Sequence, residues 1–300
     1  MKNTREVSRI VTAHRQEEGA GFIVRRPLPS MSLTVADPFL LIDELGPIDY
    51  GPGEAKGAPD HPHRGFETVS YILSGEVEHE DSARHRGVLR AGDVQWMTAG
   101  AGIVHSEMPS RALRDAGGRV HGFQIWVNLP ARLKMTAPRY QEVASAKIPT
   151  AQSPDGLARV RVVAGEALGA RAVIDTLTPI VYQDWSLDAG ADVTLPLSAE
   201  QKALVYVFDG AVELGDLAQT ARDGQLAVLA DGESVRFRVP RDAAKTARLL
   251  LLAGVPLNEP VARYGPFVMN TPQEIEQAFR DYQSGRMGEI TRTARVDAIE

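Results

Sequence analysis

The chain has 300 residues, of which 43% are hydrophobic and 24% charged, so it is long enough to bury two domain-sized cores. Its formal net charge is −6, and an acidic chain without a long basic run is a poor candidate for binding nucleic acid or an anionic membrane. The absence of cysteine excludes disulfides, thiolate metal ligands and a cysteine nucleophile.

The beginning of the chain is polar and leads into no apolar segment, so no secretory signal is expected and the cytoplasm is the expected location. The longest aliphatic run, residues 249–255, is far shorter than the roughly 20 residues that span a bilayer. No membrane partner is therefore predicted.

Short strands separated by Gly, Pro and Asp are predicted along most of the chain. A strand, a Gly turn, a strand and a second Gly turn follow one another around Gly75 and Gly92, and again around Gly210 and Gly224. This repetition favours two similar β-barrels, in an N-terminal domain of residues 1–135 and a C-terminal domain of residues 136–300. The predicted strands are 68–73, 75–80, 94–97, 120–129, 204–208, 211–214 and 225–229, and the connector is 131–155.

One helix is predicted near the end of the chain, beginning after Thr271. Thr271 is a capping residue, Pro272 occupies the first helical position, and Glu274 completes a capping box. An apolar stripe follows at helical spacing, and Gly285 is a natural stop. The stripe consists of Ile275, Ala278, Phe279 and Tyr282. A helix that packs on a barrel is expected.

All seven histidines lie at or before position 121, so a histidine-based metal site belongs to the first half. His61 and His63 occupy alternate positions, which share one face of a strand, and His105 and Glu107 repeat this spacing. Two such pairs on facing strands supply three imidazoles and one carboxylate, which suit Fe, Mn, Co, Ni, Cu or Zn and leave coordination positions open. Spacing alone leaves Glu67 as an alternative carboxylate, and unrelated surface histidines as an alternative to the whole site.

The remaining histidines are expected to have structural surroundings. His79 lies among acidic residues and is predicted on a solvated strand or loop, with a pocket wall as the alternative. His85 and His14 are predicted in a loop and in a charged segment. His121 is predicted to be a core histidine or a partner of a metal ligand. The Gly-rich segment 99–102 lacks the residues of a phosphate loop and is predicted to bend the backbone so that His105 enters the barrel.

Several long motifs resemble those of the pirin family within the cupin superfamily. These are HPHRGFETV at 61–69, EHEDS at 78–82, GDVQWMTAG at 92–100 and HSEMP at 105–109, with DPFLLIDE at 37–44 and YGPFVMNT at 264–271. Relative to the general cupin pattern, Thr98 replaces a usual Pro and Glu107 follows His105, and pirins share both departures. The resemblance extends over nearly the whole chain and is weakest in the middle of the second half.

This resemblance implies two cupin barrels of jelly-roll type with metal only in the first. It implies His61, His63, His105 and Glu107 as ligands, with Fe(II) as the usual ion and Ni, Co, Mn, Cu or Zn as alternatives. It favours Glu107 over Glu67 as the fourth ligand, which leaves Glu67 as a partner of the ligands.

The resemblance also implies a function. Some pirin-like proteins open the heterocycle of quercetin with dioxygen and release carbon monoxide, and here Glu107 would be the general base. The expected partners are then a small aromatic flavonol and O2, and a monomer is expected. The alternative is a non-enzymatic, redox-sensitive regulatory protein that acts through protein partners, since the chain has no DNA-reading motif.

Overall fold

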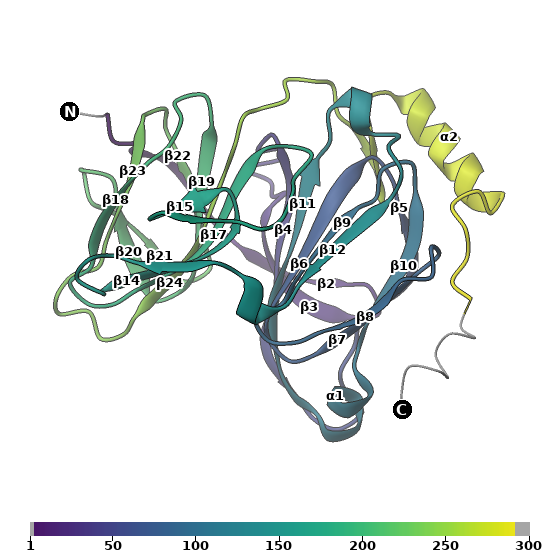
Figure 1. Ribbon diagram of the computed structural model, residues 1–300, viewed down its shortest axis with the longest axis horizontal. Coiled ribbons are helices and arrows are strands. Elements are labelled where there is room, and N and C mark those ends of the chain that lie inside the picture. The colour runs from purple at the N-terminus through teal and green to yellow at the C-terminus, as the bar shows by residue number, and fades with distance from the viewer. Residues whose placement is uncertain (1–2, 292–300) are drawn as a thin grey trace. The chain divides into compact units, whose positions relative to one another are not determined.

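The computed structural model describes residues 3–291, and strands make up most of its regular secondary structure (Figure 1). The chain forms two compact units. One comprises the residues up to His14, Arg25–Leu40 and Ala146–Leu257, and the other comprises Arg15–Val24, Leu41–Ser145 and the residues from Asn258 onward. The predicted all-β fold of two barrels followed by one C-terminal helix is confirmed.

The strands of residues 14–143 form a seven-stranded sheet and a four-stranded antiparallel sheet. The seven-stranded sheet has the order β12 (Arg139–Val143), β9 (Val94–Thr98), β6 (Phe66–Ser74), β11 (Gly118–Asn128), β4 (Phe39–Tyr50), β3 (Phe22–Leu28), β2 (His14–Glu18). The four-stranded sheet has the order β5 (Ala58–His63), β10 (Ile103–Pro109), β7 (Val77–Asp81), β8 (Arg86–Leu89).

The same plan of seven and four strands recurs in the rest of the chain. The larger sheet has the order β1 (Val7–Thr12), β22 (Gln225–Leu229), β19 (Lys202–Asp209), β24 (Ala247–Gly254), β17 (Ile180–Leu187), β14 (Ala158–Ala164), β13 (Thr150–Gln152). The smaller has the order β18 (Asp192–Pro196), β23 (Ser234–Arg238), β20 (Ala211–Leu214), β21 (Gln219–Arg222). Two hairpins are formed by β15 (Glu166–Ala167) with β16 (Ala170–Arg171), and by β25 (Ala262–Tyr264) with β26 (Phe267–Met269).

The two ends of the chain do not follow a simple division at residue 135. Strand β1 pairs antiparallel with β22, so that Val11 lies opposite Leu226 in the second half. The segment from Asn258 onward belongs instead to the unit that contains the clustered histidines. The first strand of the chain therefore belongs to the unit that is built mainly from the second half, because it is hydrogen-bonded at the edge of that unit's larger sheet. The connector 131–155 also contains structure, namely η1 (Ala131–Leu133), η2 (Ser145–Lys147), β12 and β13.

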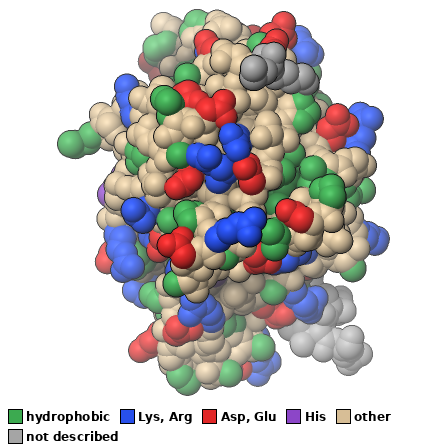
Figure 2. Space-filling model, turned by 90° about the vertical axis from the view of Figure 1, so that its left-hand side faces the viewer, with side chains coloured by type: hydrophobic (Ala, Val, Ile, Leu, Met, Phe, Trp, Pro, Cys, Tyr) green, Lys and Arg blue, Asp and Glu red, His purple; other side chains and the backbone are tan. Residues whose placement is uncertain are grey.

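Alternate residues of the second-half strands build an apolar interior. Leu249, Leu251 and Ala253 of β24 are buried in one core cluster with Trp185 and Phe237. In a strand whose alternate side chains face the core, this pattern fills the interior of the barrel with apolar side chains. Figure 2 shows acidic and basic side chains interspersed on one outer face of the molecule. No helix within residues 3–291 is long and apolar enough to cross a membrane.

The predicted C-terminal helix is α2 (Pro272–Gln283), and its capping box is confirmed: Thr271 and Glu274 each bind the other's backbone N–H. Ile275 and Ala278 are buried as predicted, but Tyr282 is 39% exposed. The buried residue at this end of the helix is instead the charged Asp281. A short helix, α1 (Arg111–Ala116), follows β10.

Candidate metal centre

Strands β5 and β10 carry the three histidines that the spacing singles out. In their antiparallel register His105 lies opposite His61, and Ile103 lies opposite His63. His61 and His63 share a face of β5 because they are two residues apart. The backbone bends before β10 at Gly100, which has φ +49. Glycine is required there, because a Cβ would lie 2.1 Å from the Thr136 carbonyl oxygen. The three rings therefore converge on one face.

The three imidazoles form one compact cluster. Their ring centroids are 4.7 Å apart for His61 and His63, 4.3 Å for His61 and His105, and 4.9 Å for His63 and His105. Each ring offers a ligand atom, and these atoms all lie within 4.8 Å of one another. Within residues 3–291 this is the group of histidine and acidic side chains whose geometry could hold a metal ion.

Burial and mutual proximity favour the neutral form of His63 and His105. Burial lowers the pKa of His63 well below its ordinary value, and the nearby His61 lowers it further. The pKa of His105 falls for the same two reasons, with added contributions from His63 and His79. A neutral imidazole retains the lone pair that binds a metal, so the site is prepared for a cation at neutral pH.

Hydrogen bonds direct the available ring nitrogens inward. His61 Nδ1 lies 2.7 Å from the carbonyl oxygen of Pro59, and His63 Nδ1 lies 3.4 Å from that of Pro266. A carbonyl only accepts, so each Nδ1 donates its proton and each Nε2 keeps its lone pair. Both nitrogens of the buried His105 have no hydrogen-bond partner in the described part of the chain. A buried polar atom without a partner is costly, and these donors fit a transition metal.

Glu107 lies next to the cluster but outside the group of three. It follows His105 by two residues on β10, where the pairing with β5 shifts register between the two residues. A bulge of this kind redirects a side chain. The Ser70 hydroxyl of β6 donates to Glu107 Oε1 at 2.7 Å, a contact that the sequence did not suggest.

Glu67, the alternative carboxylate, lies in a different environment. It is fully buried on β6 opposite Thr98 of β9, and the Thr98 hydroxyl donates to its Oε1 at 2.7 Å. The Thr that departs from the general cupin pattern therefore binds the buried Glu.

His79 is buried, contrary to the prediction of a solvated strand. The residue is 1% exposed, and its ring centroid lies 5.5 Å from that of His105 and 4.7 Å from that of Tyr140. Its neighbour Asp81 has a lowered pKa, because the nearby His79 ring, 3.8 Å away, and the hydrogen bonds from His85 outweigh the effect of burial. His79 and Asp81 share one face of β7, and Glu80 between them is buried as well, so this end of the strand is enclosed on both faces. Tyr140 lies on β12, within the stretch expected to be a connector.

The other histidines lie outside the cluster. His85 is 53% exposed in its side chain and contacts Asp81, and His14 is exposed. His121 Nε2 lies 2.8 Å from Glu44 Oε1. A cavity of about 900 Å³ lies in the second half, between β17 and β18, and contains none of the predicted ligands.

The repeated sheets and the histidine cluster define a protein with two cupin barrels. The Pirin family model matches residues 21–127, and the model of the pirin C-terminal cupin domain matches residues 182–288. The chain belongs to the pirin family. It is 44% identical over 285 residues to a pirin-like protein of Solanum lycopersicum, an alignment that covers 95% of this chain and 93% of that one. It is 43% identical over 291 residues to human pirin, covering 96% of both.

A solved structure has the same fold. It is described as quercetin 2,3-dioxygenase from Acinetobacter baumannii and superimposes with a TM-score of 0.88. The sequence identity is 37%, and the match covers 96% of this chain and all of that one. The likeness therefore includes both barrels and the order in which the chain connects them.

Proposed function

We propose that this protein is a metal-dependent dioxygenase that opens the heterocycle of flavonols such as quercetin, with uptake of O2 and release of carbon monoxide. One observation carries the proposal: the imidazoles of His61, His63 and His105 offer ligand atoms within 4.8 Å of one another, and both nitrogens of the buried His105 have no hydrogen-bond partner within residues 3–291. The full-length likeness to a protein described as quercetin 2,3-dioxygenase supports the choice of substrate.

His61, His63 and His105 would hold the ion, and Glu107 would be the fourth ligand. A divalent transition metal, most simply Fe(II), would supply Lewis acidity at this site. His63 and His105 are 3% and 1% exposed, whereas His61 is partly exposed, so substrate would approach past His61. The flavonol would lie across this partly exposed side of the cluster.

Glu107 is the proposed general base. It follows His105 by two residues on the same strand, and it is only partly buried. It would take the proton of the flavonol 3-hydroxyl group, which makes the heterocycle electron-rich and able to react with O2. The Ser70 hydroxyl, which donates to Oε1, would hold the carboxylate so that Oε2 accepts this proton.

Aerobic consumption of quercetin by the metal-loaded protein tests the proposal. At saturating metal, Glu107→Gln is expected to lower the rate about 10²- to 10⁴-fold, because a neutral amide is no base. Glu17→Gln, which removes an exposed carboxylate elsewhere in the same unit, is the control and should retain the wild-type rate. A fully loaded wild-type protein without turnover would contradict the proposal and favour the alternative, a metal-dependent regulator that acts through protein partners.

A further inference from the structure

Arg64 connects the two segments that bear the histidines. It directly follows His63, and its Nε donates to the carbonyl oxygen of Ala101 at 2.7 Å. Ala101 belongs to the turn that leads into β10 and hence to His105. The backbone N–H of Gly65 donates to Gly100 in the same turn at 2.8 Å. The Arg64 side chain and the Gly65 backbone therefore both link the end of β5 to the turn before β10.

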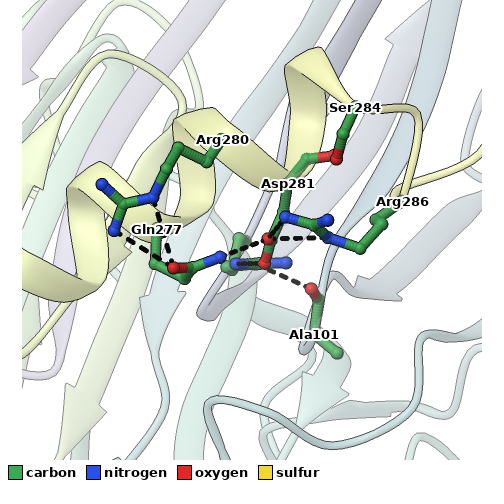
Figure 3. A network of polar contacts seen from close by, with 7 residues as sticks. Ala101, Gln277, Arg280, Asp281, Ser284 and Arg286 are labelled. Carbon is green, nitrogen blue, oxygen red and sulfur yellow. Dashed lines mark hydrogen bonds and ion pairs between the residues drawn. The ribbon is translucent and has the colours of Figure 1, made fainter.

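Asp281 of α2 fixes the direction of the Arg64 guanidinium. Arg64 Nη1 donates to Asp281 Oδ2 at 2.7 Å, and the two side chains are only 6% and 13% exposed. The other carboxylate oxygen, Oδ1, accepts from Arg286 Nε at 2.9 Å and from Gln277 Nε2 at 2.6 Å. Figure 3 shows Gln277 and Arg286 converging on Asp281, with Ala101 beside the same network. Both oxygens are thus held in place.

The strand that precedes α2 contacts the same turn through its backbone. Val268 of β26 donates its N–H to the carbonyl oxygen of Arg64 at 3.0 Å. Gly65, with φ +89, permits this approach, since a Cβ there would lie 2.0 Å from the Val268 carbonyl oxygen. Pro266, just before β26, accepts the bond from His63 Nδ1. Residues some 200 positions away in the sequence therefore surround the chain at His63.

We propose that Asp281 is a positioning residue of the metal centre, which acts through Arg64 to hold His63 and the turn before His105 in register. The inference rests on the proposed ligation by these histidines and is independent of the flavonol reaction. Removal of the carboxylate leaves a buried guanidinium without its counter-charge. Arg64 then reorients toward water, and the backbone that it ties at Ala101 loses its fixed position.

Metal affinity and ligand geometry test this role. The apparent Kd for Co(II), measured by competition with a chelator, is expected to rise about 10- to 100-fold in Asp281→Asn, the range found for residues that orient metal ligands. The visible d–d absorption bands of bound Co(II) should shift, because they report coordination geometry. Asp281→Glu, which restores the charge, should recover part of the affinity.

Glu276→Gln is the matched control, since it removes a carboxylate that is 69% exposed on the same helix and pairs with Arg280 at the surface. It should keep both the wild-type Kd and the wild-type spectrum. An unchanged Kd and spectrum in folded Asp281→Asn would overturn the inference, even if its melting temperature fell.

If Asp281→Asn yields no folded protein, Arg64→Lys takes its place. A single ammonium cannot reproduce the planar fork that reaches Ala101 and Asp281 together, so Co(II) affinity should again fall. Wild-type affinity in Arg64→Lys would overturn the inference. Failure of the wild-type protein to bind Co(II) would overturn the proposed metal centre itself. This result is distinct from wild-type affinity in a variant, which would overturn only the role of Asp281.

Discussion

Imidazole rings buried inside a barrel are costly unless their nitrogens find partners. His105 is 1% exposed and neither ring nitrogen has a hydrogen-bond partner within residues 3–291, although the strand around it is well paired. His63 is similarly buried and hydrogen-bonds at Nδ1 alone to a carbonyl. A bound cation would offset this cost, because it binds the lone pairs that the protein leaves available.

The two candidate carboxylates should differ in their effect on metal affinity. Glu107→Gln is expected to weaken Co(II) binding about 10-fold or more, because Glu107 follows His105 on β10. Glu67→Gln should change the Kd by less than about 3-fold, because Thr98 already binds Oε1 of Glu67 and an amide oxygen accepts the same bond. Competition titrations of the two variants make the comparison. Stronger weakening by Glu67→Gln would assign the fourth ligand to Glu67 instead.

The sequence predicted the three histidines because period-two spacing on a strand is a local property. It could not separate Glu67 from Glu107, since both satisfy the same alternation and only the contacts with Thr98 and Ser70 distinguish their surroundings. His79 was wrongly expected in solvent, because its acidic neighbours suggested a surface and its inward face depends on the register of β7 with β10. Long-range pairing of this kind leaves no local signal.

At the scale of elements, α2 is a capped amphipathic helix whose Asp281 also forms a buried ion pair with Arg64. Its boundaries were predicted from Thr271 and Pro272, whose capping chemistry is local. The burial of Asp281 was not predicted, because an acidic residue near a helix end is usually solvated and its partner Arg64 is 217 positions away. Only tertiary packing brings these two residues together.

The Asp281 carboxyl should make stability depend on acid. Burial opposes its ionisation, but the bonds from Arg64, Arg286 and Gln277 prevail and lower its pKa to about 2. The folded value is below the unfolded value of about 3.9, so this stabilisation is complete above about pH 4 and is lost as the pH falls towards about 2. Urea unfolding should therefore show wild type more stable than Asp281→Asn near neutral pH. The difference should shrink in that acidic window, and a difference that stays constant with pH would contradict the assignment.

At the scale of the whole molecule, one plan of seven and four strands is used twice with different interiors. The turn glycines on which the predicted repeat rests all have positive φ, with 91° at Gly75, 87° at Gly92, 72° at Gly210 and 76° at Gly224. This part of the architecture was predictable because a left-handed turn demands glycine. The pairing of β1 with β22 was not predictable, because no sequence pattern marks which distant strand will pair at the edge of a sheet.

The second barrel should be important for stability and not for metal binding. Leu249 is fully buried in its core, so Leu249→Ala should lower the free energy of unfolding by about 2–5 kcal/mol. Leu217→Ala, at a side chain that is 80% exposed, should change it by less than about 0.5 kcal/mol. Denaturant unfolding provides the values, and metal content should be the same in both variants. A Leu249→Ala protein as stable as wild type would contradict the packing described for this core.

The central claim is that His61, His63 and His105 bind one transition-metal ion, and elemental analysis of purified protein tests it most directly. The native protein should contain about one ion per chain, and His105→Ala should lose it while its far-ultraviolet circular dichroism is unchanged. His14→Ala, at an exposed histidine outside the cluster, should keep the ion. Full metal content in folded His105→Ala would contradict the site.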